Sequence, residues 1–104
     1  MIFTTTNTIE GKKITNYLGM VTGADFYLAA GLIGEGLVKA DEHFSYHCDR
    51  IRNQMISKAT ALGADGIVGV QMNFSIGQGH TVYLSCVGTA VNFEDADTDE
   101  LPDL

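Results

Sequence analysis

The amino-acid sequence predicts an α+β fold: an antiparallel β-sheet with one long helix packed on one face, in the order β-β-α-β-β. Three observations support this prediction. An apolar stripe of helical period lies in the middle of the chain, a run with two-residue alternation follows it, and β-branched residues dominate the segments before it. A chain of 104 residues has the usual size of one domain.

Two strands are predicted before the helix. Residues 2–6 are β-branched and aromatic and predict a short strand, and residues 12–28 predict a longer one. Gly19 and Gly23 lie inside the longer segment, where glycine indicates a bulge or a close approach of the backbone to another element. The glycine-rich stretch at residues 29–39 predicts a flexible connector or a short helix.

The long helix is predicted from about Asp41 to Leu62. Asp41 and Glu42 would lie in its first turn, where carboxylates favour the helix dipole, and Gly63 would supply a left-handed cap at its end. Apolar residues recur along this segment at intervals of three and four, which places them on one face. They are Phe44, Cys48, Ile51, Met55, Ala59 and Leu62.

Two strands joined by a tight turn are predicted after the helix. Residues 66–76 alternate between apolar and polar side chains, which is typical of a sheet covered on one side. Residues 77–79 (Gly-Gln-Gly) predict the turn, and residues 80–93 the returning strand. This last strand is apolar on both faces, with Val82, Leu84 and Cys86 on one and Tyr83, Val87 and Val91 on the other. One helix covers one face of a sheet, so the second face predicts contact with another copy of the chain.

The predicted domain covers residues 1–93, and residues 94–104 predict a disordered acidic tail. The formal net charge is −7, and six of the thirteen acidic residues lie in this tail. The six lysines and arginines are scattered, so the chain lacks the basic stripe that nucleic-acid binding requires. We therefore expect no nucleic-acid partner.

The sequence shows neither a secretory signal pattern nor an apolar run of the roughly 20 residues needed to span a bilayer. Its two cysteines are expected to be free thiols in a reducing compartment. We therefore expect a cytoplasmic protein without a membrane partner.

Three blocks of the sequence resemble the YbjQ-like family. They are residues 4–23, beginning Thr-Thr-Thr-Asn and containing Ile-Glu-Gly-Lys-Lys-Ile; residues 61–70, Ala-Leu-Gly-Ala-Asp-Gly-Ile-Val-Gly-Val; and residues 88–91, Gly-Thr-Ala-Val. They occur in the family's order across residues 1–93. The resemblance implies a dodecin-like core and a closed homo-oligomeric ring of five subunits. Members of the family are described as heavy-metal-binding proteins without an assigned activity.

His43, His47 and Cys48 form the sharpest chemical pattern. Histidines four residues apart share a helix face and can reach one zinc, copper or nickel ion, with Cys48 or a nearby carboxylate as a third ligand. Against this, Cys48 belongs to the apolar stripe, His43 lies toward solvent and His47 lies at the border. That placement favours a packed cysteine and surface or boundary histidines, so no resident metal cofactor is expected, and the three residues remain the candidate metal ligands.

No enzyme motif is visible. Cys86 and His80 lie six residues apart on one strand, but nothing in the sequence supplies a thiol-activating environment, and no nucleophile-elbow pattern occurs. We therefore expect a non-enzymatic oligomeric scaffold or a small-ligand-binding module whose ligand sits between subunits. The alternative is a heavy-metal-binding or metal-sensing protein.

Overall fold

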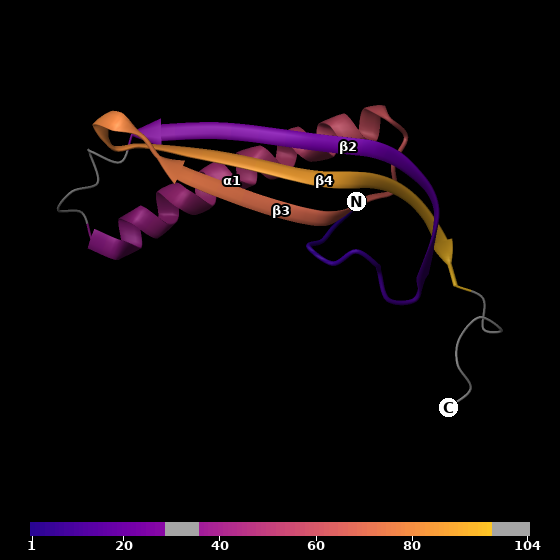
Figure 1. Cartoon of the computed structure of the whole chain (residues 1–104). Coiled ribbons are helices and arrows are strands. Elements are labelled where there is room, and N and C mark those ends of the chain that lie inside the picture. Colours follow the sequence, from indigo (N-terminus) through magenta and orange to yellow (C-terminus); the bar gives the residue numbers. More distant parts are fainter. Residues whose placement is uncertain (29–35, 97–104) are drawn as a thin grey trace.

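The computed structural model describes residues 1–28 and 36–96, with the side chains of its helix described from Glu42 onward. The elements are β1 (Ile2–Phe3), β2 (Lys12–Leu28), α1 (Gly36–Ala61), β3 (Gly66–Ile76) and β4 (Thr81–Asp95), with a 3-10 turn at Gln78–His80 between the last two strands (Figure 1). The predicted order β-β-α-β-β is confirmed. Residues 29–35 of the predicted connector lie outside the described residues, and residues 36–39 are helical.

The four strands form a mixed sheet in the order β1-β3-β4-β2. The prediction of a wholly antiparallel sheet is wrong, because β1 pairs with β3 in parallel, with Ile2 opposite Gly66 and Phe3 opposite Ile67. The long strand β2 pairs with the far edge of β4, so β1 joins the opposite edge of the sheet. The first strand is also shorter than predicted. Beyond β1, the backbone of Thr4 and Thr6 still bonds to β3 without forming a regular ladder: the Thr4 N–H donates to the Ile67 carbonyl, and the carbonyls of Thr4 and Thr6 accept from the N–H groups of Val70 and Gly69. The two threonine hydroxyls bond to each other and to nearby backbone.

Strands β2 and β4 form a long antiparallel ribbon that curls at one end (Figure 1). Their register runs from Lys12 opposite Asp95 to Leu28 opposite Thr81 and shifts twice, once between Tyr17 and Gly19. Gly19 has a φ of 121°, which side chains rarely adopt, so the predicted bulge at this glycine is confirmed.

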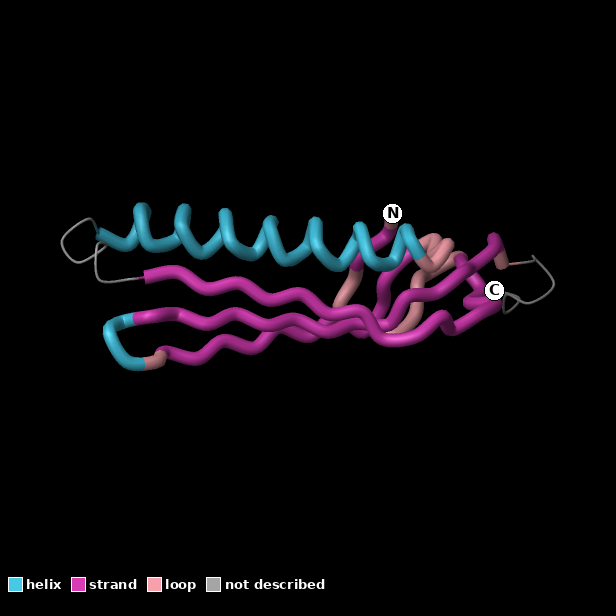
Figure 2. The backbone as a smooth tube through the Cα atoms, turned by 90° about the horizontal axis from the view of Figure 1, so that it is seen from above, coloured by secondary structure: helices cyan, strands magenta, loops and turns pink. Residues whose placement is uncertain are grey.

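The helix lies along one face of the sheet, alongside β2, and the β3–β4 hairpin lies farther from it (Figure 2). It begins at Gly36, earlier than predicted, so no acidic residue lies in its first turn and that part of the prediction is wrong. Its end matches the prediction. Gly63 has a φ of 78°, and its N–H donates to the Thr60 carbonyl.

The core lies between α1 and the sheet. Ile51, Met55 and Ala59 of the predicted stripe are fully buried, whereas Leu62, just beyond the helix, is half-exposed. The predicted inner face of β4 is confirmed, since its three residues belong to the core. The buried cluster contains Val21, Ile51, Met55, Ala59, Ile67, Val70, Val82, Leu84, Cys86 and Ala90.

The C-terminal strand passes the predicted domain boundary at residue 93. It continues to Asp95, whose carboxylate pairs with the Lys12 ammonium, and the Ala96 N–H donates to the Gly11 carbonyl. The remainder of the predicted tail, residues 97–104, lies outside the described residues. In the part of the chain that is described, no helix combines the length and apolar character needed to cross a bilayer.

Candidate functional site

His47 faces the sheet from α1 and is buried, with 9% of its surface exposed. Its Nδ1 atom lies 2.6 Å from Oδ2 of Asp25 on β2. Its ring stacks on Tyr27, with centroids 4.5 Å apart and an interplanar angle of 8°, and meets the edge of Tyr46. The prediction that His47 is a surface or boundary residue is therefore wrong, because a partner 22 residues earlier in the chain draws the imidazole inward.

The carboxylate of Asp25 is held in its ionised form. Burial alone would raise the pKa of Asp25, but hydrogen bonds from His47 and from the Phe26 N–H, together with the charge of Arg50, hold this pKa below its ordinary value of 3.8. Arg50 Nε lies 3.6 Å from the oxygen that His47 contacts. An ionised carboxylate only accepts hydrogen bonds, so Nδ1 of His47 carries the proton and donates it.

The three candidate metal ligands, His43, His47 and Cys48, lie in two different places. His43 is exposed, as predicted, and lines a shallow hollow of about 360 Å³ with Glu42, Tyr46 and His47. Cys48 points elsewhere: its Sγ atom lies 3.7 Å from Sδ of Met72 on β3.

The donor chemistry fits a metal only in part. Nδ1 of His47 is engaged by Asp25, which leaves Nε2 as its free donor atom. Burial raises the pKa of the Cys48 thiol, and the charge of Asp49 raises it further, so this thiol is protonated at neutral pH. Among the described residues, no three His, Cys, Asp or Glu side chains converge on one point. The hollow thus offers two imidazoles near each other and a thiol outside it.

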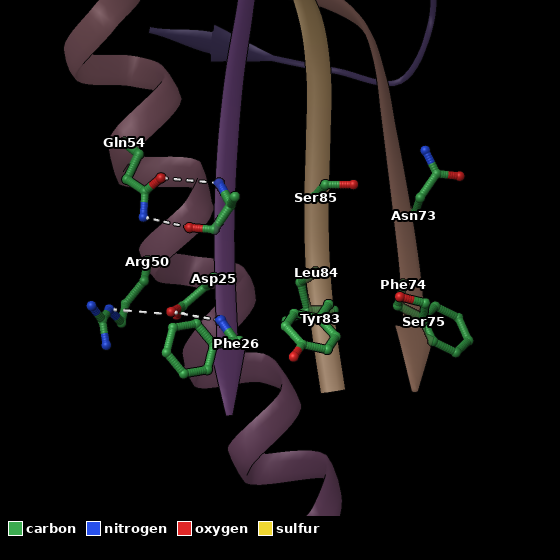
Figure 3. Close-up of a pocket in the computed structure, with 11 residues that line it drawn as sticks. Asp25, Phe26, Arg50, Gln54, Asn73, Phe74, Ser75, Tyr83, Leu84 and Ser85 are labelled. Atoms are coloured by element: carbon green, nitrogen blue, oxygen red, sulfur yellow. Dashed lines mark hydrogen bonds and ion pairs between the residues drawn. The ribbon is translucent and has the colours of Figure 1, made fainter. Parts of the chain in front are cut away.

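An open groove of about 500 Å³ lies where the sheet face opposite the core meets the edge of β2 and the helix (Figure 3). Strand β2 contributes Phe26, β4 contributes Tyr83 and Ser85, and β3 contributes Asn73. The rings of Phe26 and Tyr83 have centroids 6.3 Å apart. A second hollow of about 500 Å³ shares Asn73 and Ser85 with the first and extends the groove along the sheet.

Two helix side chains close the edge of this groove (Figure 3). Gln54 bonds to both backbone groups of Ala24: its Oε1 accepts from the N–H at 3.1 Å, and its Nε2 donates to the carbonyl at 3.0 Å. Arg50 pairs with Asp25, as described above. The groove therefore presents aromatic rings, hydroxyls and an amide around one internally paired set of charges, a composition typical of small-molecule pockets.

Sequence reasoning missed Asp25 and Gln54. Both act through partners 22 and 30 residues away, and neither belongs to a motif. Phe26 and Tyr27 directly follow Asp25, and two adjacent aromatic residues on a strand place one ring on each face of the sheet. No other local signal pointed to this part of β2.

Large apolar side chains remain exposed on both faces of the sheet. On the face opposite the helix, Met20 is 71%, Phe26 64%, Leu28 66% and Tyr83 50% exposed. On the helix side, α1 lies over β2 and leaves the end of β3 uncovered, so Phe74 and Ile76 are also exposed. Several large exposed apolar side chains on one sheet face are typical of interaction surfaces.

These features define a small α+β domain with an open groove and exposed apolar side chains on both faces of its sheet. A family model described as "Putative heavy-metal-binding" (YbjQ_1) matches residues 1–94. The chain belongs to this YbjQ-like family.

Curated relatives are UPF0145 proteins. Those of Corynebacterium jeikeium and Methanothermobacter thermautotrophicus are each 36% identical to the chain, covering 90% and 91% of it and 100% and 98% of their own lengths. That of Bacillus velezensis is 38% identical, over 90% of this chain and 93% of its own. A crystal structure of a DUF74-family protein from Pediococcus pentosaceus has the same fold, with a TM-score of 0.69 at 22% identity, over 90% of this chain and 98% of that one.

Proposed function

We propose that this protein is a non-enzymatic scaffold or small-ligand-binding module that works as a closed, dodecin-like ring of five identical subunits. The exposed apolar surface opposite the helix is the main support. Four large side chains on this surface, Met20, Phe26, Leu28 and Tyr83, are at least half exposed. They lie on strands whose other face is already buried under α1. A second copy of the chain would bury this surface.

The edges of the sheet favour a cyclic arrangement. Gln54 and Lys58 bond to the outward backbone of β2 at Ala24 and Thr22, which covers that edge from within the chain. The opposite edge is formed by β1, two residues long, and beyond it by the second half of β3, which pairs with β4 alone. Because the β2 edge is covered, a fibre that grows by pairing at both edges is disfavoured, and assembly through the sheet faces, closed by rotational symmetry, fits this chain better.

The groove in Figure 3 is the proposed ligand site. It lies on the same face as the exposed Phe26 and Tyr83 rings and is open toward solvent. A neighbouring subunit seated on this face would close the groove, and a small planar or apolar ligand would then lie between two subunits, with Asn73 and Ser85 as hydrogen-bonding groups.

Light scattering coupled to gel filtration tests the assembly over a wide dilution range. We expect one species of about five chain masses that persists to micromolar concentration. A folded monomer at that concentration would contradict the proposal, and another closed number would correct only the five.

A second candidate function is heavy-metal binding or sensing, because His43 and His47 line one hollow. Calorimetric titration of zinc, copper and nickel into protein without an affinity tag tests it. Stoichiometric binding that disappears in a His43→Ala, His47→Ala double variant would support it, and no heat of binding with the wild-type protein would contradict it. Equal heats in both proteins would mean that other residues hold the metal.

We place the protein in the cytoplasm. Cys48 and Cys86 are both free thiols in the structure, and a reducing compartment preserves free thiols.

A further inference from the structure

Sulfur atoms from three elements gather where α1 meets β3 and β4. Sγ of Cys48 lies 3.7 Å from Sδ of Met72. Cys86 is the cross-strand partner of Met72 in the β3–β4 register and belongs to the core beneath the helix. Side chains of directly opposed residues on one sheet face start about 4.5–5.5 Å apart at Cβ, so Cys86 is a near neighbour of the Met72 side chain.

The pKa of the Cys86 thiol is raised in the folded protein. Burial raises the pKa of the Cys86 thiol; a hydrogen bond to the Val87 backbone opposes this rise, and the Cys48 sulfur adds to it. Cys48 and Cys86 each adjoin Met72, the first across the contact between helix and sheet and the second across the β3–β4 ladder. We call these three residues the sulfur cluster.

The separation between the sulfur atoms of Cys48 and Met72 suits a shared ion. Two sulfur atoms bound to one metal at about 2.3 Å lie about 3.7–4.0 Å apart when the angle between the bonds is tetrahedral to trigonal. The Cys48–Met72 separation of 3.7 Å falls in this range. A thiol–thioether packing contact has a similar length, so the inference rests also on the third sulfur opposite Met72 and on the route by which an ion can enter.

The cluster is open on one side and closed on the other. Met72 is 39% exposed, because α1 leaves β3 uncovered, and Cys48 is half-buried. Cys86 is only 4% exposed and closes the inner side. An ion can therefore approach over Met72 and come to rest against the buried thiol, which provides the entry path that a metal site needs.

We propose that Cys48, Met72 and Cys86 form a binding site for a soft monovalent metal ion, Cu(I) or Ag(I). Sulfur ligands select soft ions over magnesium or calcium, and the thioether of Met72 favours a monovalent soft ion over zinc, whose protein ligands are Cys, His, Asp and Glu. When the ion binds, one thiol releases its proton to solvent, and the resulting thiolate and monovalent cation are together neutral. Neutrality matters here because the cluster adjoins the apolar core, where a net charge is costly. The inference rests on the metal-binding function proposed as the second candidate, but it assigns sulfur ligands in place of imidazoles.

Anaerobic competition for Cu(I) between the untagged protein and the chromogenic chelator bicinchoninate tests the site. We expect one Cu(I) per chain. Met72→Leu keeps the side-chain volume and should preserve the fold while weakening Cu(I) binding by about tenfold or more. Met20→Leu removes an exposed thioether from the opposite sheet face and is the matched control, expected to bind as wild type. Cys48→Ala, at a half-buried position, provides a second ligand deletion.

X-ray absorption of the Cu(I)-loaded protein should show a first shell of sulfur at about 2.3 Å. Wild-type affinity in both Met72→Leu and Cys48→Ala, or a first shell of nitrogen, would overturn the sulfur site. If the His43→Ala, His47→Ala variant alone loses the metal, the metal-binding function stands and the sulfur assignment is wrong. If zinc, copper and nickel titrations also give no heat with wild type, the metal-binding function fails as well.

Discussion

His47 of the helix and Asp25 of β2 form a buried hydrogen-bonded pair, with 2.6 Å between Nδ1 and Oδ2. The pair joins the middle of α1 to the strand that lies alongside it, and Tyr27 stacks on the imidazole from the same strand. Since Asp25 and Tyr27 are two residues apart on β2, they present to the helix both a charge and a flat ring. The contact therefore fixes the rotation of α1 about its own axis as well as its position.

We predict that Asp25→Asn destabilises the fold by about 1–3 kcal/mol at neutral pH, the usual cost of losing a hydrogen bond to a charged group. The pKa of Asp25 is lowered in the folded state, so its contribution is complete above the ordinary value of 3.8 and is lost as the pH falls below it. Chemical denaturation of both proteins from pH 7 to pH 3 measures this.

The difference in unfolding free energy between wild type and Asp25→Asn should shrink as the pH falls below 3.8. Asp49→Asn, at an exposed position on the same helix, is the control and should behave as wild type across the range. A pH-independent difference for Asp25→Asn would show that its ionisation contributes nothing.

Gln54 completes the edge of β2 in the way that a neighbouring strand would, since its amide bonds to both the N–H and the carbonyl of Ala24. We predict that Gln54→Ala lowers stability by about 1 kcal/mol and increases concentration-dependent aggregation, because the exposed edge can then pair with another chain. Denaturation and static light scattering on heating provide the two readouts. Asn53→Ala, at the exposed neighbouring position, should change neither.

Gly88 permits the close contact between β4 and the core. A Cβ atom at this position would lie 2.6 Å from Cγ2 of Ile67 and 3.2 Å from Cγ2 of Val70. We predict that Gly88→Ala destabilises by about 1–3 kcal/mol through overpacking. Thermal unfolding compared with Ser85→Ala, an exposed position on the same strand, measures it. Equal melting of both variants would mean that the neighbouring side chains move aside without cost.

The regular elements were predictable because their signals are local. The positions of Ile51, Met55 and Ala59 repeat every four residues, and all three are buried as that period requires. The strand pattern of residues 66–76 also held, with bounds that match β3. By contrast, the first turns of α1 lie in a glycine-rich stretch whose composition argues against a helix, so its start was placed too late.

The misses depend on contacts distant in sequence. No local pattern states which edge of the sheet β1 will join: β2 occupies the edge beside β4, and β1 pairs in parallel with β3 at the other. The metal candidates were chosen because histidines and a cysteine are close in sequence. Cys48 instead meets Met72, 24 residues later, and His47 meets Asp25, 22 residues earlier. Neither pairing is visible before the helix is docked.

The outer face of the sheet gives the sharpest test of assembly. Phe26 and Tyr83 are cross-strand partners on β2 and β4, with exposed rings 6.3 Å apart, and the Tyr83 ring lies against Gly77, where a Cβ atom would come within 2.7 Å of it. This contact holds the Tyr83 ring in place on the surface. A fixed aromatic pair at the centre of an interface typically contributes much of its binding energy. We predict that Tyr83→Asp and Phe26→Asp each dissociate the proposed five-subunit assembly, because a carboxylate buried against a neighbouring subunit would have no partner.

Val87 tests the same face further along β4. It is half-buried within the chain, so Val87→Asp should weaken assembly and also lower the stability of the monomer. Tyr83→Asp and Phe26→Asp should mainly affect assembly. Ser57→Asp, exposed on the helix, is the matched charge control and should leave the oligomer intact. Phe74→Asp places the same charge on the helix side of β3. If Phe74→Asp dissociates the oligomer while Tyr83→Asp and Phe26→Asp assemble normally, the uncovered helix side of β3 makes the subunit contact and the groove on the outer face faces solvent.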